Sequence, residues 1–389
     1  MQRPIKIGFL TPYSSVYPYY HHHITTAWMI GMGVTAPQNS PLQFIYEYAG
    51  NGSMRMTQQA IKKLQFIDQV DVFSGLISYK ALPEIFSFID KQHRPSFFFD
   101  MGEYIPSAKH LNPNTFLASH QLWQSQFALG HWAQKQFGDA GHIVLPLYES
   151  GYHLNSAFTN GAQAAGGTAV HLTVLHDYPG HQPGTAINYE PFFESLVKTQ
   201  PPYVHAIFSG NQGTDFLKLW ISKGFHKKIP LVVIETMAYD DVLADIAHID
   251  MQFYSSMMWN RDDETPLNQS FVKPFEQLTG QKANIYALLG YEAGLAWKEV
   301  LPYALKQDWS TVTSLLHREV IQSPRGTRSF SLESGNGLPS TQIIKVNVEF
   351  NKTQRIIVEQ GKGKIFADKD FESIHEYSVS GWQNPFLCI

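Results

Sequence analysis

Cysteine is almost absent from this chain: among its 389 residues only Cys388, beside the C-terminus, carries a thiol. A single thiol excludes an internal disulfide and any metal site built from several cysteines. Long apolar runs are also missing, because residues 97–99 and 143–147 are the richest stretches and a membrane-spanning helix needs ~18–20 residues. The 29 lysine and arginine residues are slightly outnumbered by 33 aspartate and glutamate residues. This balance offers no broad basic surface to a phosphate backbone. We therefore expect a soluble protein that does not bind nucleic acid.

Motifs of the common enzyme and cofactor sites are missing as well. The sequence contains no phosphate-binding loop ending in Gly-Lys-Ser/Thr, no Gly-x-Ser-x-Gly elbow and no His-Glu-x-x-His helix. Residues 31–36 loosely fit the dinucleotide-binding fingerprint, but they close a predicted helix and are interpreted as its C-terminal end. His21, His22 and His23 do not share a helix face and have no accompanying acidic or cysteine ligands, so a polar loop is predicted there. We predict no catalytic residue, no cofactor and no metal.

Apolar residues are plentiful and follow a strand–helix alternation. They make up 43% of the chain, enough for two domains with separate cores. A first series of predicted strands begins at residues 5, 42, 70 and 95, and a second series begins at residues 143, 170, 204 and 231. Helical patterns separate the strands, which is typical of parallel sheets covered on both faces. The predicted fold class is α/β, with two Rossmann-like lobes built on parallel central sheets.

The pattern changes after about residue 250. A predicted strand at 252–254 and helices at 267–278 and 285–305 precede strands at 329–332, 342–350 and 355–359. Turn signals at 335–337 and 351–352 favour antiparallel pairing of these late strands. The late elements could complete either earlier unit, so the domains need not be contiguous.

Small polar and aromatic residues follow the predicted strands of both units. In an open parallel sheet, ligands bind beyond the carboxyl ends of the strands. This mixture suits a small polar ligand that stacks on rings and is hydrogen-bonded at its head group. The alternative, that these serines, glycines and aspartates only cap the following helices, stays open for each single position.

Five short strings carry a family resemblance. They are residues 5–12 (IKIGFLTP), 70–75 (VDVFSG), 164–167 (AAGG), 290–293 (GYEA) and 323–327 (SPRGT). In this order, and over nearly the whole chain, they resemble strings of the type I periplasmic binding proteins. The resemblance is to the leucine/isoleucine/valine-binding branch, which comprises substrate-binding proteins of ABC transporters.

The resemblance implies two α/β lobes joined by a three-segment hinge, whose closure encloses the ligand. Crossings are expected near residues 120, 250 and 327, giving a first lobe of 1–120 and 250–327 and a second of 121–249 and 328–389. The protein is then a monomeric periplasmic or extracellular receptor that delivers a small polar ligand to a membrane permease. The ligand would be an amino acid, an amide or a related compound. A ligand-sensing regulatory protein of the same fold is the alternative, because residues 1–4 lead into the first strand without a secretory signal.

Strand ends and the resemblance together give the candidate ligand-binding residues. They are Tyr13, Ser14, Ser78, Tyr79, Asp100, Met101, Gly102, Ser150, Tyr152, Ser209, Asn211, Glu235 and Trp259. Ser150 departs from the aromatic residue of the family, and Tyr148 or Tyr152 is expected to supply the lost ring. Two roles are open for the aromatic residues near the expected cleft: they line a pocket with their rings, or they pack in the core. These residues are Tyr13, Tyr17, Tyr19, Tyr20, Tyr79, Tyr104 and Trp259.

Two carboxylates among these candidates bear on the charge of the ligand. Glu235 falls on the acidic position that pairs with the ligand ammonium in amino-acid-binding members. The alternative for Glu235 is an acid that stabilises a helix N-terminus. Asp100 replaces a small residue where such members present neutral donors to the ligand carboxylate, and it would repel that group. The expected ligand is therefore a cation, an amide or a polyol.

Overall fold

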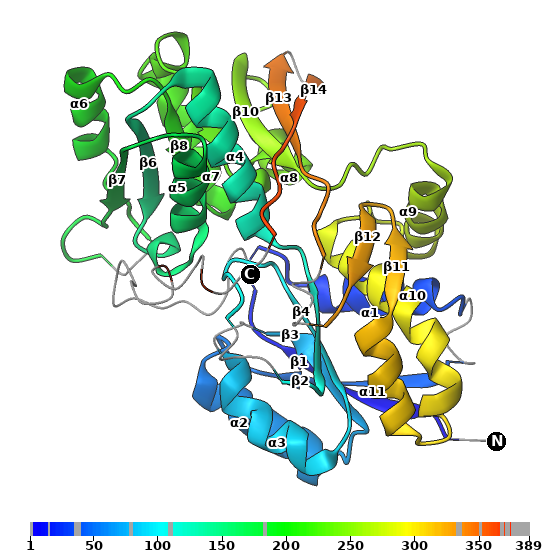
Figure 1. The fold of residues 1–389 in the computed structure, drawn as a ribbon. Helices are drawn as coiled ribbons and strands as arrows, with labels where there is room; N and C mark the ends of the chain where they lie inside the picture. Colours follow the sequence, from blue (N-terminus) through cyan, green and yellow to red (C-terminus); the bar gives the residue numbers. More distant parts are fainter. Residues whose placement is uncertain are drawn as a thin grey trace.

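The computed structural model shows two lobes, each built from one β-sheet with helices on its faces (Figure 1). It describes residues 3–14, 16–34, 40–77, 81–107, 112–181, 185–331, 337–349 and 352–365, with Lys369 and Ile374. Within this part of the chain, no helix has the length and apolar character needed to cross a membrane.

The first lobe contains a five-stranded parallel sheet in the order β2-β1-β3-β4-β5. Its strands are β1 (Ile5–Thr11), β2 (Leu42–Tyr48), β3 (Val72–Leu76), β4 (Ser96–Asp100) and β5 (Thr115–Ser119). Every residue of β3, β4 and β5 is buried. Burial on both faces explains why β4 reads as a continuous apolar run and not as an alternation.

The second lobe contains a seven-stranded sheet in the order β14-β13-β10-β9-β8-β6-β7. Its strands are β6 (Gly141–Pro146), β7 (Val170–Leu175), β8 (Val204–Ala206), β9 (Leu231–Val233), β10 (Met251–Met257), β13 (Gln342–Glu349) and β14 (Lys352–Gln360). The strands from β6 to β10 pair in parallel, and β13 and β14 pair antiparallel, as the late turn signals predicted.

Helices cover both sheets (Figure 1). On the first lobe they are α1 (Tyr20–Gly31), α2 (Met54–Phe66), α3 (Leu82–Gln92), α9 (Pro266–Thr279), α10 (Ile285–Ala304) and α11 (Trp309–Arg318). On the second they are α4 (Leu122–Phe137), α5 (Leu154–Ala164), α6 (Glu190–Thr199), α7 (Gly210–Ser222) and α8 (Asp240–Ala244). Short 3-10 turns follow two strands of the second lobe, η4 (Glu149–Gly151) and η6 (Glu235–Ala238), and η5 (Phe225–Lys227) follows α7. A hairpin of β11 (Val320–Ser323) and β12 (Gly326–Ser329) follows α11.

The chain passes between the lobes three times. The first passage joins β5, which ends at Ser119, to α4, which packs on α5. The boundary expected at residue 250 is wrong, because β10 pairs with β9 and β13 in the seven-stranded sheet. The boundary expected at 327 is also too early, since Ser331 still forms a bridge with Phe116 of β5. The sequence of a segment at a lobe boundary does not mark which of the two sheets it joins, which explains both errors.

The predicted fold class is confirmed: the chain is α/β, with two lobes and mainly parallel sheets. The loop predicted for His21, His22 and His23 is wrong, because these residues form the first turn of α1. Tyr19 precedes this helix and its side chain makes no capping hydrogen bond. The helix start therefore lacks the usual sequence signal.

Glycines let α1 and α10 pack at backbone distance. A Cβ atom on Gly290 would lie 2.1 Å from the Ile24 carbonyl oxygen, and one on Gly31 would lie 2.3 Å from the Tyr291 carbonyl oxygen. No side chain fits at either position without moving a helix. This contact holds the start of α10, and with it Tyr286, in place beside α1.

We expect Gly290→Ala to lower the free energy of unfolding by about 1–3 kcal/mol, because the added methyl group forces α1 and α10 apart. Urea denaturation measures the change. Gly213→Ala in α7 is the matched control, since its Cβ would lie 3.3 Å from the side-chain Cγ of Met237. Alanine favours a helix, so this control should be neutral or slightly stabilising. Equal stability of the two variants would contradict the proposed importance of the α1–α10 contact.

Candidate functional site

A cavity of about 260 Å³ is lined by residues of both lobes. The first lobe contributes Tyr17, from the loop before α1, and the segment that begins α10. The second lobe contributes η6, the start of α8, and parts of β10, β13 and β14. Its aromatic wall residues are Tyr17, Tyr239, Trp259 and Tyr286. Its charged wall residues are Glu235, Asp240, Asp241, Arg261, Asp262, Lys282 and Arg355.

Glu235 is the buried member of these charged residues, with 3% of its surface exposed. Its Oε1 accepts a hydrogen bond from the Met258 N–H and lies 3.3 Å from His120 Nε2. Its Oε2 has no hydrogen-bond partner among the described residues. Burial lowers the pKa of His120 despite the nearby Glu235, so the imidazole is neutral and does not balance a carboxylate charge. Glu235 thus offers a bound molecule one unused acceptor.

Arg325, in the turn between β11 and β12, connects α10 to the first passage between the lobes. Its Nε and Nη2 donate to the two carboxylate oxygens of Glu292, each over 2.7 Å. Nη2 also donates to the Ser119 carbonyl over 2.9 Å, and Nη1 lies 3.1 Å from His120 Nδ1. Both charged side chains are about 1% exposed. Burial alone would raise the pKa of Glu292, but the guanidinium outweighs it and holds that pKa below its usual value.

Arg328 adds a second buried guanidinium beside the first. Its Nη2 donates to the Gln121 side-chain oxygen and to the Ser119 carbonyl. Burial and then repulsion from Arg325 lower the pKa of Arg328 to about 9. Through His120 and Glu235, this arginine pair is linked to Met258, at the second passage. The Gln121 side-chain amide donates to the Gly337 carbonyl over 3.2 Å, in the third passage. Hydrogen bonds therefore join all three passages of the chain between the lobes.

A second group of polar residues, all buried except the half-buried Tyr148, lies where the loop after β4 meets the loop after β6. We call Glu103, Tyr104, Tyr148, Glu149 and Tyr152 the acid–tyrosine cluster. The Tyr104 and Tyr152 rings make an edge contact at 5.4 Å, and the Tyr148 and Tyr152 rings make one at 6.2 Å. The His153 N–H donates to the Glu103 carbonyl over 3.0 Å, which ties the two loops together across the lobes.

Glu149 carries an uncompensated carboxyl group inside this cluster. It is 1% exposed, and its Oε1 accepts a hydrogen bond from the Ser209 hydroxyl. Its Oε2 finds no partner in the described part of the chain. Burial raises the pKa of Glu149 to about 8, with only the Ser209 hydrogen bond acting in the opposite direction. Burial also raises the pKa of Tyr152 well above its usual value, and the neighbouring acids and phenols add to that shift.

The loop after β4 is hydrogen-bonded to the first passage. The Met101 and Gly102 carbonyls accept from the N–H groups that begin α4, those of Leu122 and Trp123. Gly102 has φ +74°, and a Cβ there would lie 2.3 Å from Gln121 Cα, so only glycine fits. Burial raises the pKa of Asp100 to about 7, although Ser119 and the Gly102 N–H hydrogen-bond to it.

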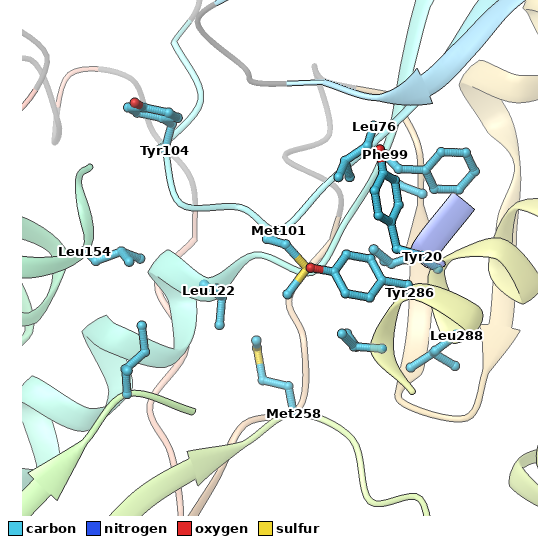
Figure 2. Close-up of a cluster of buried hydrophobic side chains, with 14 of the residues drawn as sticks. Tyr20, Leu76, Phe99, Met101, Tyr104, Leu122, Leu154, Met258, Tyr286 and Leu288 are labelled. Carbon is cyan, nitrogen blue, oxygen red and sulfur yellow. The ribbon is translucent and has the colours of Figure 1, made fainter. Parts of the chain in front are cut away.

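Apolar side chains pack between the cavity and this loop. Figure 2 shows Met101, Leu122, Met258 and Tyr286 converging where the lobes meet. All four are at most 2% exposed. The lobes are therefore closed on each other in this structure, with both groups of polar residues buried in the interface.

Only some of the predicted ligand-binding residues lie in the cavity wall. Glu235 and Trp259 lie in the cavity wall. Asp100, Met101, Ser150 and Tyr152 are buried outside it. The Ser209 hydroxyl donates to Glu149, and the Ser14 Oγ accepts from the Tyr17 N–H and so supports the loop that carries Tyr17. Gly102 has a backbone role, Tyr13 and Asn211 are exposed residues outside the wall, and Ser78 and Tyr79 lie outside the described residues.

Two aromatic wall residues, Tyr239 and Tyr286, were missed by sequence reasoning. Tyr239 follows η6 closely, so the end of β9 was a signal for it. Tyr286 begins α10, and only the three-dimensional arrangement brings that helix start to the cleft. Of the other aromatic candidates, Tyr17 reaches the wall and Tyr20 belongs to the core, where its hydroxyl donates to the Pro12 carbonyl.

Among the described residues, no set of three or more histidine, cysteine, aspartate or glutamate side chains is arranged to hold a metal ion.

A family model described as a periplasmic binding protein matches residues 4–353. The chain belongs to the periplasmic binding protein family. The match spans both lobes and confirms the resemblance drawn from the sequence strings. Membership agrees with the prediction of a solute-binding protein located in the periplasm. No curated protein matches the chain at a significant level.

Solved structures show the same fold at low identity. An ABC transporter substrate-binding protein from Sphaerobacter thermophilus has a TM-score of 0.76 at 18% identity, over 92% of this chain and 98% of that chain. A solute-binding protein of an ABC transporter from R. palustris, in complex with benzoate, has a TM-score of 0.72 at 17% identity, over 93% and 98%. A leucine-binding protein from Thermotoga maritima has a TM-score of 0.64 at 12% identity, over 90% and 97%.

We expect Arg325→Met to lower the free energy of unfolding by about 3–5 kcal/mol, because it leaves the Glu292 carboxylate buried and unpaired. Urea denaturation measures the loss. The double variant Glu292→Leu with Arg325→Met removes both charges and should recover most of that stability. A double variant no more stable than Arg325→Met would contradict this account of the ion pair.

Without ligand, the free energy of unfolding should fall between about pH 6.5 and about pH 8.5. The contribution of the Glu149 carboxyl to this fall is about 1–2 kcal/mol. Its folded pKa is raised, so the folded state keeps a proton that the unfolded state has released, and this stabilisation is lost as pH rises through about 8. Asp100 acts in the same direction. Urea denaturation at both pH values should show a smaller fall for Glu149→Gln, and an unchanged fall for the exposed control Glu194→Gln. An unchanged fall in Glu149→Gln would refute the assignment.

Proposed function

We propose that this protein is the solute receptor of an ABC transporter and captures one small organic molecule between its lobes. The observation that carries the proposal is the cavity of about 260 Å³, which is lined by residues of both lobes and contains an unused oxygen of Glu235. Cavities with apolar walls and a few polar groups are typical of small-molecule sites. Family membership supports the same function.

The lobes must separate for a solute to enter, because the polar residues of the interface are buried. The Tyr17 hydroxyl donates to Asp241 Oδ2 over 2.5 Å and links the two lobes at the cavity wall. The His153 contact to the loop after β4 is a second link. We propose that the three passages of the chain, joined by Arg325 and His120, act as the hinge.

Within this proposal the receptor is monomeric, lies in the periplasm and passes its solute to a membrane permease. The proposed site combines the cavity wall, including Glu235 and Trp259, with the buried residues Asp100, Ser150, Tyr152 and Ser209. Four aromatic side chains in the wall suit an apolar or aromatic body. The solute class considered from the sequence, an amino acid, an amide or a related compound, is compatible with a cavity of this size.

A solute that binds should make the protein more compact, because it stabilises the closed arrangement over an open one. We expect a thermal-shift screen of amines, amides, amino acids and aromatic acids to raise the melting temperature with at least one class. Small-angle X-ray scattering should then show a smaller radius of gyration with that compound than without it. Tyr17→Phe removes one link between the lobes and should weaken binding while leaving the solute preference unchanged. Binding without compaction, or no binding in any class, would contradict the receptor function.

A further inference from the structure

We propose that the solute is an organic cation, a primary amine with an apolar or aromatic body and no carboxylate of its own. This inference rests on the proposed function, since it names the class of molecule that the same cleft takes. It depends on where the cleft has unused acceptors and on where its cations are already paired.

Unused acceptors lie in the cavity wall and are buried. Glu235 Oε2 and Ser256 Oγ both belong to wall residues, and neither atom has a partner among the residues described. Glu235 is 3% and Ser256 is 1% exposed. An ammonium group brings three N–H donors for such acceptors and supplies the positive charge that neutral His120 does not.

The aromatic walls suit a cation as well as an apolar body. The Tyr17 and Tyr286 rings lie 5.2 Å apart. The Trp259 Nε1–H donates to Asn268 Oδ1 over 2.8 Å, so its polar edge is already bonded and the ring remains as an apolar surface. Aromatic faces attract ammonium groups within roughly 6 Å, most strongly when water is excluded.

Among the described residues, the arginines of the cavity wall are already paired, so a solute carboxylate would compete with acids of the protein. Outside the wall, Arg325 is paired with Glu292. Arg328, also outside the wall, donates from Nη2 to Gln121 and the Ser119 carbonyl, and its Nη1 has no partner among the described residues. Arg261 and Arg355, in the wall, already pair with acids of the protein. Lys282 also lines the cavity, but it is exposed and remains hydrated.

The rest of the buried interface also disfavours a further negative charge. Asp100 and Glu149 each have a carboxyl oxygen without a partner in the described chain, and no lysine or arginine described there pairs with either group. The pKa of each is raised, to about 7 and about 8, because burial is not offset by a cation. A solute carboxylate would therefore enter a site that already disfavours negative charge, whereas an amine would stabilise it.

Three matched compounds test the inference on the unaltered protein: 2-phenylethylamine, L-phenylalanine and 3-phenylpropanoate. They share a ring and a short chain and carry respectively an ammonium, both charges, and a carboxylate. By calorimetry at neutral pH, the amine should bind at least about tenfold more tightly than the amino acid, and the acid should bind most weakly. Tighter binding of either carboxylate-bearing compound would overturn the inference.

A variant pair locates the effect within the cavity. Glu235→Gln keeps the shape of the side chain and removes its charge, so affinity for the amine should fall about 100-fold. Asp262→Asn changes an exposed carboxylate of the same wall that pairs with Arg261, and it should change affinity less than about threefold. Urea denaturation verifies that both variants fold. Equal losses in the two would contradict a specific role for Glu235.

The outcomes separate this inference from the proposed function. If L-phenylalanine or 3-phenylpropanoate binds more tightly and compacts the protein, the receptor function stands and the amine class is wrong. If none of the three compounds and no compound of the wider screen binds, both are wrong. Amine binding that survives Glu235→Gln unchanged would place the cation elsewhere and overturn the geometry argued above.

Discussion

The structure depends on how the Arg325 guanidinium is placed among the three chain passages. This side chain neutralises Glu292 of α10, bonds the Ser119 carbonyl and contacts the His120 ring. His120 in turn contacts Glu235, whose carboxylate receives the Met258 N–H at the second passage. Residues from far-separated parts of the sequence thus share one set of hydrogen bonds. A rearrangement at the cavity cannot leave the hinge unaffected, because Glu235 belongs to both.

The charge distribution along this network is uneven, and that unevenness has a functional meaning. At the hinge the buried Glu292 carboxylate is held by two nitrogens of the Arg325 guanidinium, and among the described residues Arg328 donates only to neutral oxygens. Toward the cleft, Glu235, Asp100 and Glu149 each have an oxygen without a partner among the described residues. Buried carboxyl groups without a counter-charge cost stability, and such costs concentrate where a protein binds a partner. The low identity to solved relatives, 12–18% for those compared, leaves the solute to be argued from these groups.

Sequence patterns predicted the architecture well where periodicity and burial agree. The alternation in β1 and β2 and the antiparallel tail strands β13 and β14 were visible, since each has one distinct apolar face or a turn signal. Helix α4 and strand β5 were not predicted. Every residue of α4 from Leu122 to Gln134 is buried, so this stretch lacks the exposed polar face that marks a surface helix.

The site was only partly predictable for a related reason. Glu235 and Trp259 stand at positions that a strand end or a family string marks, and both line the cavity. Tyr239 reaches the same wall from the end of the 3-10 turn η6, and Tyr286 reaches it from the start of α10. Their placement depends on how the lobes close, and on glycine contacts such as that of Gly290 with Ile24, which no local pattern contains.

A crystal structure of the protein with 2-phenylethylamine bound would test the central claim most directly. The account predicts one molecule between the two sheets, with its nitrogen within hydrogen-bond distance of Glu235 Oε2 and its ring among Tyr17, Trp259 and Tyr286. The Arg325–Glu292–His120 hydrogen bonds should be retained. An amine bound outside the cavity, or with its nitrogen turned away from Glu235, would contradict the account.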